Sequence, residues 1–414
     1  MEPHVPKLPR FDVIIAGGGF VGLALALALA KLAPAGYRVA LIDAEAPDAG
    51  KDDPRASALS ASTRRLLTVL GVWPALHSEA QPITSIEITD SPLNSSLRPH
   101  FLGFDRDDET GDSGASMVEN RHLRAALQEA TRAEPAVETF APDSASDFRV
   151  TPFGVTVTLA GGDEIEAGLL VAADGKRSGL RERAGIKCVG WSYPQTGIVT
   201  TVAHAKPHHG RAVQHFLPGG PFAILPLKGY CSSIVWSEDK SRGEAIMALD
   251  EASFVAELTK RFGHRLGAIA LAGPRQSFPL DLQIARTFVA ERLALIGDAA
   301  HAVHPLAGQG LNIGIRDVAA LAEILVEGAR LGLDPGTASL LQRYERWRRF
   351  DSAFSAAVMD GLNRLFSNDN LALRALRDLG LGLVDRAPQL KRFLVREAAG
   401  TTGEVPRLLK GERV

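Results

Sequence analysis

The chain has 414 residues, of which 45% are hydrophobic and 23% charged, and its formal net charge is −2. This apolar fraction excludes a disordered chain, and the near-neutral charge argues against a nucleic-acid partner, which would favour a basic surface. The length predicts two or three domains. The two cysteines, Cys188 and Cys231, have the spacing of neither a disulfide framework nor a zinc site, so we expect a cytoplasmic protein without a metal centre.

An uncharged run from Val13 to Ala30 lies near the start of the chain. It is long enough to cross a bilayer and stands where a signal peptide would lie. Four glycines crowd it, however, where they would weaken a spanning helix. We therefore predict a buried strand over Phe11–Ala16, a glycine turn, and a buried helix that ends before Pro34.

The glycines form the pattern Gly17-x-Gly19-x-x-Gly22 between the predicted strand and helix. In a dinucleotide-binding turn the first glycine makes the tight turn, the second lets the backbone approach a pyrophosphate, and the third lets the helix pack on its strand. A second predicted strand, Arg38–Ile42, ends at Asp43, which is placed to bind the ribose hydroxyls of an adenosine. This part of the chain predicts an FAD or NAD site.

The middle of the chain departs from a repeated strand–helix pattern. After Ile86, an acidic and poorly periodic segment runs to about Ser116, which we interpret as a solvated insertion. Strands are predicted over Phe153–Leu159 and Ile165–Ala172, and short β-rich runs separated by glycine turns occupy residues 196–237, typical of an antiparallel sheet. His204, His208 and His209 lie beside Pro207 and Gly210, which predicts a loop rather than a metal site.

Two further stretches follow apolar strands: Asp174-Gly175-Lys-Arg-Ser-Gly-Leu-Arg181, and a longer one from Gly297-Asp298 through His304-Pro305 and Gly308 to Asp317. With the glycine fingerprint, and in the same order, they resemble the three motifs of the class A flavoprotein monooxygenases. That resemblance implies the fold of para-hydroxybenzoate hydroxylase. We therefore expect a mixed α/β chain, in which a Rossmann-like FAD-binding domain is interleaved with an antiparallel-sheet substrate domain and followed by C-terminal helices.

The domain boundaries follow from this order. The FAD-binding domain is predicted over residues 9–80, 117–186 and 283–330, the substrate-binding sheet over 81–116 and 187–282, and a helical region over 331–414.

The third motif also has a physical interpretation. Asp298, at the end of a buried strand over Leu293–Ile296, can hydrogen-bond a ribityl hydroxyl, although a carboxylate capping a helix without any ligand would look the same. Pro305 and the glycines at positions 308, 310 and 314 remove side-chain bulk, so that the backbone can lie close to a flat ring. A helix that begins at about Leu311 presents unpaired amides and the positive end of its dipole. We expect His301 to be a structural hydrogen-bonding residue and assign His304 and Pro305 to the reaction face as catalytic candidates.

Two arginines fit a diphosphate, because a guanidinium pairs two oxygens at once. Arg55, followed by Ala56, and Arg121 are similar to cofactor-contacting positions of the family, although arginines in surface ion pairs explain them too. The residues predicted to hold the cofactor are Gly17, Gly19, Gly22, Asp43, Arg55, Ala56, Arg121, Asp174, Gly175, Gly297, Asp298, Pro305, Gly308, Gly310, Leu311 and Asn312.

A narrower resemblance, to the ubiquinone-biosynthesis hydroxylases, lies in Phe278-Pro-Leu-Asp-Leu, in Asn363-Arg-Leu-Phe-Ser-Asn368 and in the tail around Gly403. It implies an FAD-dependent monooxygenase that uses NAD(P)H, with NADPH as our choice, and O2. The reaction would hydroxylate the aromatic ring of a polyprenylated precursor through a flavin C4a-hydroperoxide. Two alternatives stay open: a hydroxylase of small soluble phenols, and a non-catalytic FAD-binding subunit of a quinone-biosynthesis assembly.

For the substrate, we predict that the antiparallel sheet forms the ring pocket with His215, Phe216 and Phe222, although aromatic residues of a sheet core would show the same pattern. From Arg386 to Val414 there are seven Lys or Arg and three Glu. Such a segment predicts either a basic amphipathic helix at the inner face of an anionic membrane, or a helix packed on the FAD domain with a solvated basic face. Association with other ubiquinone-biosynthesis proteins and a homo-oligomer stay open.

Overall fold

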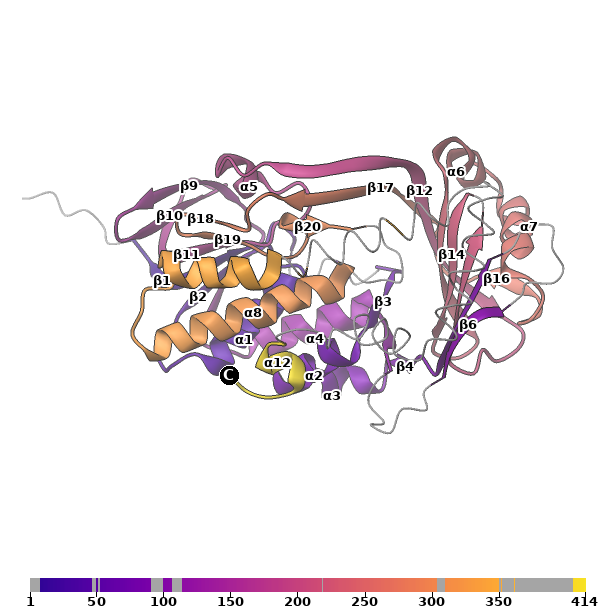
Figure 1. The fold of residues 1–414 in the computed structure, drawn as a ribbon, viewed down its shortest axis with the longest axis horizontal. Helices are drawn as coiled ribbons and strands as arrows, with labels where there is room; N and C mark the ends of the chain where they lie inside the picture. The colour runs from indigo at the N-terminus through magenta and orange to yellow at the C-terminus, as the bar shows by residue number, and fades with distance from the viewer. Residues whose placement is uncertain are drawn as a thin grey trace, which may run out of the picture.

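The computed structural model describes residues 8–46, 50, 53–90, 100–105, 114–217, 219–303, 310–349, 351, 361 and 405–414. In these residues two sheets stand at opposite ends of an elongated molecule, joined by a long two-stranded ribbon (Figure 1). The predicted catalytic residues His304 and Pro305, and the predicted cofactor residue Gly308, lie outside the described residues. So do residues 362–404, which include most of the predicted basic tail.

The first sheet is built around parallel strands in the order β19-β11-β1-β2-β8. Antiparallel strands β9 and β10 extend it beside β11, and β18 pairs with β19. The strands of this sheet are β1 (Arg10–Ala16), β2 (Val39–Ile42), β8 (Val137–Phe140), β9 (Ala145–Thr151), β10 (Gly154–Leu159), β11 (Glu164–Ala172), β18 (Val289–Ala290) and β19 (Leu293–Leu295).

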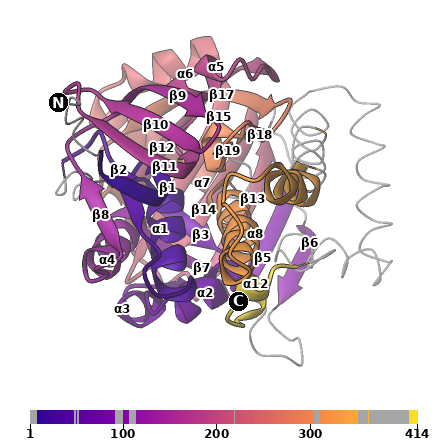
Figure 2. The same ribbon diagram turned by 90° about the vertical axis from the view of Figure 1, so that its left-hand side faces the viewer.

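Helices α1, α4 and α8 cover one side of the parallel strands, while β9, β10 and the short helix α5 lie on the other (Figure 2). The central helix α1 is buried nearly all round because it packs between the sheet and the helices α4 and α8. The helices of this domain are α1 (Phe20–Leu32), α2 (Ala61–Val69), α3 (Trp73–His77), α4 (Asn120–Arg132), α5 (Gly179–Arg183), α8 (Gly310–Arg330), a further helix over 338–349, and α12 (Arg407–Lys410).

The uncharged run from Val13 to Ala30 is therefore the end of β1, a glycine turn and most of α1, as the sequence predicts. Among the described helices, none is long and apolar enough to cross a membrane. At the other end of the chain, α12 packs on α2 and α8, with Leu408 and Leu409 buried. Residues 405–414 thus follow the packed-helix alternative.

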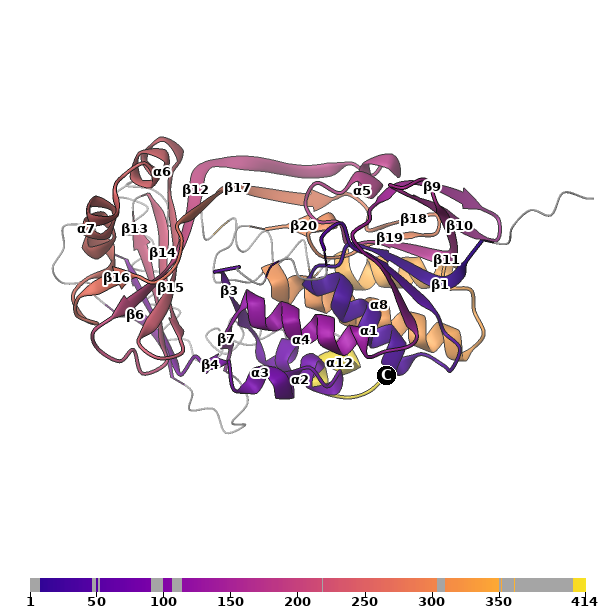
Figure 3. The ribbon, with the colours of Figure 1, turned by 180° about the vertical axis from the view of Figure 1, so that it is seen from behind.

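The second sheet is mainly antiparallel, in the order β20-β17-β12-β15-β14-β13-β5-β6, with β16 beside β12. Its strands are β5 (Ser85–Asp90), β6 (His100–Asp105), β12 (Cys188–His204), β13 (Arg211–Leu217), β14 (Gly220–Leu227), β15 (Cys231–Asp239), β16 (Ile269–Leu271), β17 (Gln276–Ala285) and β20 (His301–Ala302). The outer side is covered by α6 (Lys240–Met247) and α7 (Glu251–Phe262), as Figure 3 shows.

A small third sheet of β3 (Ala56–Leu59), β7 (Ser116–Glu119) and β4 (Gln81–Pro82) lies between the two large ones (Figure 3). The ribbon that joins the two large sheets consists of β12 and β17, paired from Cys188 with Ala285 to Val199 with Gln276. Because both strands pass from one domain to the other, the ribbon fixes how the antiparallel sheet faces the parallel one.

The structure corrects the interpretation of the acidic segment after Ile86 as a solvated insertion. Its described part contains β5, which pairs in parallel with β13, and β6, which pairs with β5. The apolar residues Ile86 and Ile88 alternate with Glu87 and Thr89 along β5, so that one face of this short strand is apolar. This alternation of apolar and polar residues covers too few positions to be recognised as a strand among the surrounding acidic residues.

The structure also corrects the predicted ring pocket. His215 and Phe222 are opposite each other on β13 and β14, and their rings stack at 6.3 Å on the face covered by α6 and α7. Phe222 has no exposed surface and contacts Trp236 edge-on, while His215 hydrogen-bonds Thr89. Both residues belong to the core between sheet and helices, and their predicted pocket role is wrong. Phe216, the next residue along β13, points to the opposite face, because side chains alternate along a strand.

We expect Phe222→Ala to lower the free energy of unfolding by about 3–5 kcal/mol, because it empties a buried aromatic site. Urea and thermal denaturation of the full chain measure this change. Phe153→Ala is the control, since that ring is 81% exposed, and it should change stability by less than about 0.5 kcal/mol. Equal effects of the two substitutions would contradict the assigned sheet face.

Candidate active site

Four loops predicted from separate parts of the sequence lie at one edge of the parallel sheet. The glycine turn follows β1, Asp43 follows β2, Asp174 follows β11, and the Gly297-Asp298 turn follows β19. These four strands are parallel neighbours, so their carboxyl ends share an edge. In open α/β sheets this edge is where ligands bind.

The glycine turn combines crowded positions with an open one. Gly17 has a φ of 119°, and a Cβ on Gly22 would lie 1.9 Å from the carbonyl oxygen of Gly17, so the turn and α1 touch directly. By contrast, a Cβ on Gly19 would meet no atom within 4 Å. Gly19 is the N-cap of α1, and no side chain of the cap residue hydrogen-bonds the first amides of the helix. This is the environment that an anionic diphosphate needs.

Asp43 lies against this turn and explains why Gly18, which is outside the Gly17-x-Gly19-x-x-Gly22 pattern, is also a glycine. A Cβ on Gly18 would lie 2.1 Å from Asp43 Oδ2, so that only glycine leaves room for the carboxylate. Arg124 on α4 approaches the same oxygen at 3.5 Å and pairs with Glu45 at 2.7 Å. Arg124 was not predicted, because it lies 81 residues after Asp43 in the sequence and only the fold brings it here.

The second motif forms a turn that is fastened to the third. Gly175 has a φ of 80° and open space where its Cβ would be, and Asp174 accepts a hydrogen bond from the Leu180 amide at 3.4 Å. Arg181 is buried and donates to the carbonyl oxygens of Ala299, at 2.9 Å, and Lys176, at 3.0 Å. The Lys176 ammonium in turn pairs with Asp281 on β17, which ties this loop to the ribbon.

The third motif begins with a single 3-10 turn, Gly297–Ala299, directly after β19. Asp298 is exposed, whereas all its neighbours between Gly297 and Ala302 are buried. Although its side chain reaches solvent, desolvation by the surrounding protein raises the pKa of Asp298, and the nearby His301 and Lys176 oppose that rise. The turn thus presents one carboxylate to the site.

Near its start, helix α8 packs closely on the first turn of α1 and on Gly297, the first residue of the third motif. A Cβ on Gly314 would lie 2.8 Å from Val21 Cγ2 and 3.3 Å from the Cα of Gly297, so the helix needs glycine here. A Cβ on Gly310 would meet nothing within 4 Å, which leaves the N-terminus of α8 open. The half-buried Leu311 follows it.

The side chain of Asn312 is used inside the protein. Its Nδ2 donates to the carbonyl oxygen of Ala58 at 2.8 Å, and its Oδ1 accepts from the Ser60 amide at 3.0 Å and from Thr63 Oγ1 at 2.8 Å. These bonds fasten α8 to the junction of β3 and α2. Any role of Asn312 toward a cofactor is therefore left to its main chain.

The two predicted arginines are both in ion pairs. Arg55 donates from Nε and Nη2 to the two carboxylate oxygens of Asp53, at 2.8 Å each, and lies over the ring of Phe278. Burial alone would raise the pKa of Asp53, but hydrogen bonds from Arg55 and Asn120 outweigh it, and the pKa is lowered. Ala56 follows as the first residue of β3.

Arg121, at the start of α4, is half exposed and donates to Glu119 Oε2 at 3.0 Å. In the structure both arginines therefore fit the ion-pair alternative, and their contact with a diphosphate stays a prediction.

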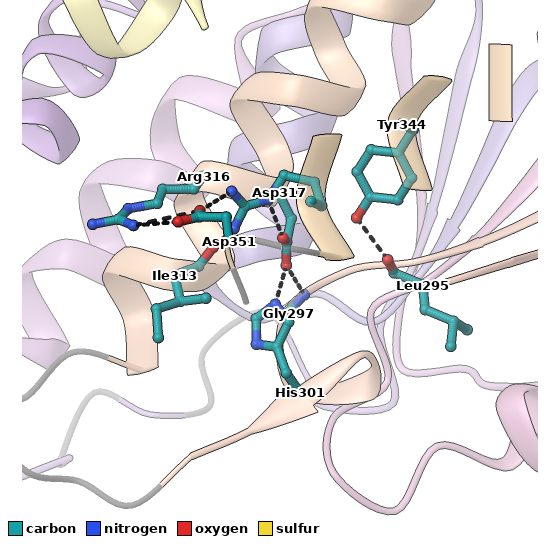
Figure 4. A network of polar contacts seen from close by, with 9 residues as sticks. Leu295, Gly297, His301, Ile313, Arg316, Asp317, Tyr344 and Asp351 are labelled. Atoms are coloured by element: carbon teal, nitrogen blue, oxygen red, sulfur yellow. Dashed lines mark hydrogen bonds and ion pairs between the residues drawn. The ribbon is translucent and has the colours of Figure 1, made fainter. Parts of the chain in front are cut away.

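A buried charged network lies behind the third motif (Figure 4). Asp317, on α8, is fully buried between His301 and Arg348, with contacts of 2.6 and 2.7 Å. Burial alone would raise the pKa of Asp317, but the charges and hydrogen bonds of His301 and Arg348 outweigh burial and lower it. The expected structural role of His301 agrees with this contact. Arg348 was missed, because nothing in the sequence after the third motif marks it.

Comparisons with known proteins agree with this geometry. Residues 10–360 match the family model described as FAD binding domain. The chain is 47% identical to ubiquinone hydroxylase UbiL of Rhodospirillum rubrum, over 97% of this chain and 92% of that one. It is 35% identical to 3-demethoxyubiquinol 3-hydroxylase of Escherichia coli, over 94% of this chain and 98% of that one.

The chain belongs to the FAD-binding monooxygenase family. The fold of this flavin hydroxylase is that of p-nitrophenol 4-monooxygenase PnpA from Pseudomonas putida, with a TM-score of 0.78 and 22% identity over 96% of this chain and 100% of that one.

The described residues fit an FAD. Open space lies beside Gly19 at the N-terminus of α1, beside Gly175 and at the start of α8, and the exposed carboxylates of Asp174 and Asp298 lie on the loops between these elements. Among the described residues no group of His, Cys, Asp or Glu is arranged to hold a metal ion.

The open and crowded glycines predict opposite effects of the same substitution. Gly19→Ala should leave the thermal midpoint of the FAD-free protein unchanged but weaken FAD binding at least tenfold, since the methyl group enters the ligand's space. Gly22→Ala should lower that midpoint, because its methyl group clashes with the Gly17 carbonyl oxygen. Thermal unfolding and flavin fluorescence titration separate the two effects, and an unchanged FAD affinity for Gly19→Ala would contradict the assigned diphosphate position.

The lowered pKa of Asp317 predicts a pH-dependent stability. Its ionised form contributes above the unfolded carboxyl pKa of about 4, and this contribution is lost as pH falls further. At pH 7, Asp317→Asn should lower the free energy of unfolding by about 3–5 kcal/mol, because it removes the buried anion that Arg348 Nε and His301 face. The difference in the free energy of unfolding between Asp317→Asn and wild type should become smaller below about pH 4. Urea unfolding at a series of pH values measures this change. Asp334→Asn, in a partly exposed pair with Arg292, is the control and should cost less than about 1 kcal/mol.

Proposed function

We propose that this flavin hydroxylase acts on the aromatic ring of a polyprenylated ubiquinone precursor, with NAD(P)H and O2 as co-substrates. The proposal is supported by its likeness, over nearly the whole chain, to proteins named ubiquinone hydroxylase and 3-demethoxyubiquinol 3-hydroxylase. The single observation that carries it is the 47% identity to the former over 97% of the chain.

The protein's own residues bind and orient the cofactor in such a reaction. FAD, when bound, supplies the redox and oxygen chemistry, so no catalytic triad is needed. We propose that the α1 amides and Gly19 hold its diphosphate, that Asp43 holds the adenosine ribose, and that Asp298 holds the ribityl chain. The amides at the start of α8 would face the ring and stabilise negative charge. The catalytic proposal for His304 and Pro305 rests on the sequence alone.

We place the substrate ring against the face of the antiparallel sheet that α6 and α7 leave uncovered. Strand register puts Gln214, Ala223, Val235 and Val199 side by side on this face. Gln214, Val235 and Val199 are half buried although they lie in the middle of the sheet. A largely apolar wall suits an aromatic ring and excludes water, while the Gln214 amide can hydrogen-bond a ring oxygen.

The same face meets the parallel-sheet domain at one end. There Ala212 and Leu227 pack against Ala58 of β3 and Met117 of β7. The wall therefore continues toward the elements that surround the proposed FAD site, which is what transfer of an oxygen from a flavin to a ring requires. Phe216 keeps its proposed substrate role on this face.

Some parts of the proposal rest on residues outside the described ranges. We propose that the basic segment after Arg386 contacts the inner face of a membrane, where a polyprenylated substrate would lie, and that the protein is cytoplasmic. We also propose NADPH rather than NADH as the reductant.

We expect Asp298→Ala to lose FAD while the protein stays soluble, with a dissociation constant raised at least tenfold, or about 1.4 kcal/mol. Flavin fluorescence released on dilution of the holoenzyme measures this change. Asp163→Ala, in an exposed turn, is the control. Retention of wild-type FAD affinity by Asp298→Ala would contradict the ribityl assignment.

Turnover with matched substrates tests the proposed reaction. The purified yellow protein should consume NAD(P)H and O2 in equal amounts with a polyprenylated phenol, and at least tenfold less efficiently with the same phenol lacking the prenyl chain. Equal efficiency would favour a hydroxylase of small phenols, and bound FAD without any NAD(P)H oxidation would favour a non-catalytic subunit. Quinone profiling of a deletion strain then identifies the accumulated precursor and the ring position.

A further inference from the structure

Side chains on the buried side of the turn that carries Asp298, away from the site, hydrogen-bond the turn. Between Gly297 and Ala302 only Asp298 is exposed, and the Asp317 carboxylate lies on the buried side of the turn. Asp317 Oδ2 accepts from the Gly297 amide at 2.9 Å and contacts His301 Nε2 at 2.6 Å. One oxygen therefore binds Gly297 and His301, the two ends of the segment that carries Asp298.

The donor at this contact is the histidine. The lowered pKa of Asp317 keeps its carboxylate ionised, and an ionised carboxylate only accepts hydrogen bonds. His301 Nε2 therefore carries a proton directed at Asp317. The second oxygen, Oδ1, accepts from Arg348 Nε at 2.7 Å, so three donors converge on one buried anion. An asparagine at this position could not accept all three, because its amide nitrogen would face a donor.

A second group holds the other side of the same turn. Arg181 donates to the Ala299 carbonyl oxygen, one residue after Asp298. The main chain on both sides of Asp298 is thus fixed by buried charged side chains, one from α5 and one from α8. Figure 4 shows the α8 side, where Gly297 and His301 both lie against Asp317.

We propose that Asp317 and His301 are positioning residues for FAD binding, which fix the Gly297–His301 turn so that Asp298 is directed at the ribityl chain before the cofactor arrives. The helix over 338–349 takes part through Arg348, which neutralises Asp317 and also pairs with Asp351. This inference rests on membership of the FAD-binding family and on the proposed ribityl contact of Asp298. It does not depend on the substrate.

The control is Tyr344, on the same helix as Arg348. Its hydroxyl donates to the carbonyl oxygen of Leu295 at 2.8 Å, so it supports the strand before the turn without contacting the turn itself. Tyr344→Phe removes one buried hydrogen bond and destabilises the same region. A merely structural role of His301 and Asp317 would make their variants resemble this one.

The experiment measures FAD dissociation from the holoenzyme by flavin fluorescence, at a temperature where circular dichroism shows each variant folded. His301→Leu, which removes the donor, should weaken FAD binding at least tenfold. His301→Gln, whose Nε2 can replace the imidazole donor, should stay within about threefold of wild type. Tyr344→Phe should stay within about twofold, even though its thermal midpoint falls. Asp298→Ala, measured in parallel, shows whether the ribityl assignment itself holds.

Two results would overturn the proposal. One is FAD binding by His301→Leu within twofold of wild type, and the other is an equal loss in His301→Leu and Tyr344→Phe. If His301→Leu does not fold, hydrogen exchange in the FAD-free wild-type protein decides the matter. The Gly297 amide should then exchange as slowly as the Leu295 amide in β19, which bonds Phe288. Fast exchange at Gly297 would show that the turn is not fixed in advance.

Discussion

The constraint on which this structure depends is the parallel pairing of β1 with β2 and β11, and of β11 with β19. Parallel neighbours bring their carboxyl ends to one edge, and each of these strands ends in a loop that carries part of the FAD site. The backbone pairing of these strands brings residues as distant as Gly17 and Asp298 to the same edge. The side chains of the loops then have only to fill the space that the strand order creates.

Close packing between the motifs follows from that constraint. Gly22 touches the Gly17 carbonyl, Gly18 makes room for Asp43, and Gly314 lets α8 rest on Val21. A glycine is required at each of these positions because another backbone or side chain occupies the place of its Cβ. Elsewhere in the site, at Gly19 and Gly310, the space is open, which separates the glycines that serve the fold from those that serve the ligand.

Buried charge gives the site its precision. Asp317 would be costly inside the protein without partners, and Arg348 offsets that cost while leaving the other oxygen to bind the turn. The same principle operates at Arg181, whose buried guanidinium joins the second motif to the third. Asp317 and Arg181 each bind main-chain atoms of the turn, so the position of Asp298 depends on groups that do not line the site.

The sequence alone determined the local elements and the family. A glycine cluster inside an uncharged apolar run that ends before Pro34 predicted β1, the turn and α1, and three ordered motifs indicated an FAD-dependent monooxygenase. Local patterns suffice for these features because each depends on neighbouring residues. Contacts between distant segments could be seen only in the folded chain: Arg124 beside Asp43, Arg348 beside Asp317, and the face of the antiparallel sheet that helices cover. His215 and Phe222 show the physical reason, because alternation along β13 and β14 places them together, but only the packing of α6 and α7 decides which face is core.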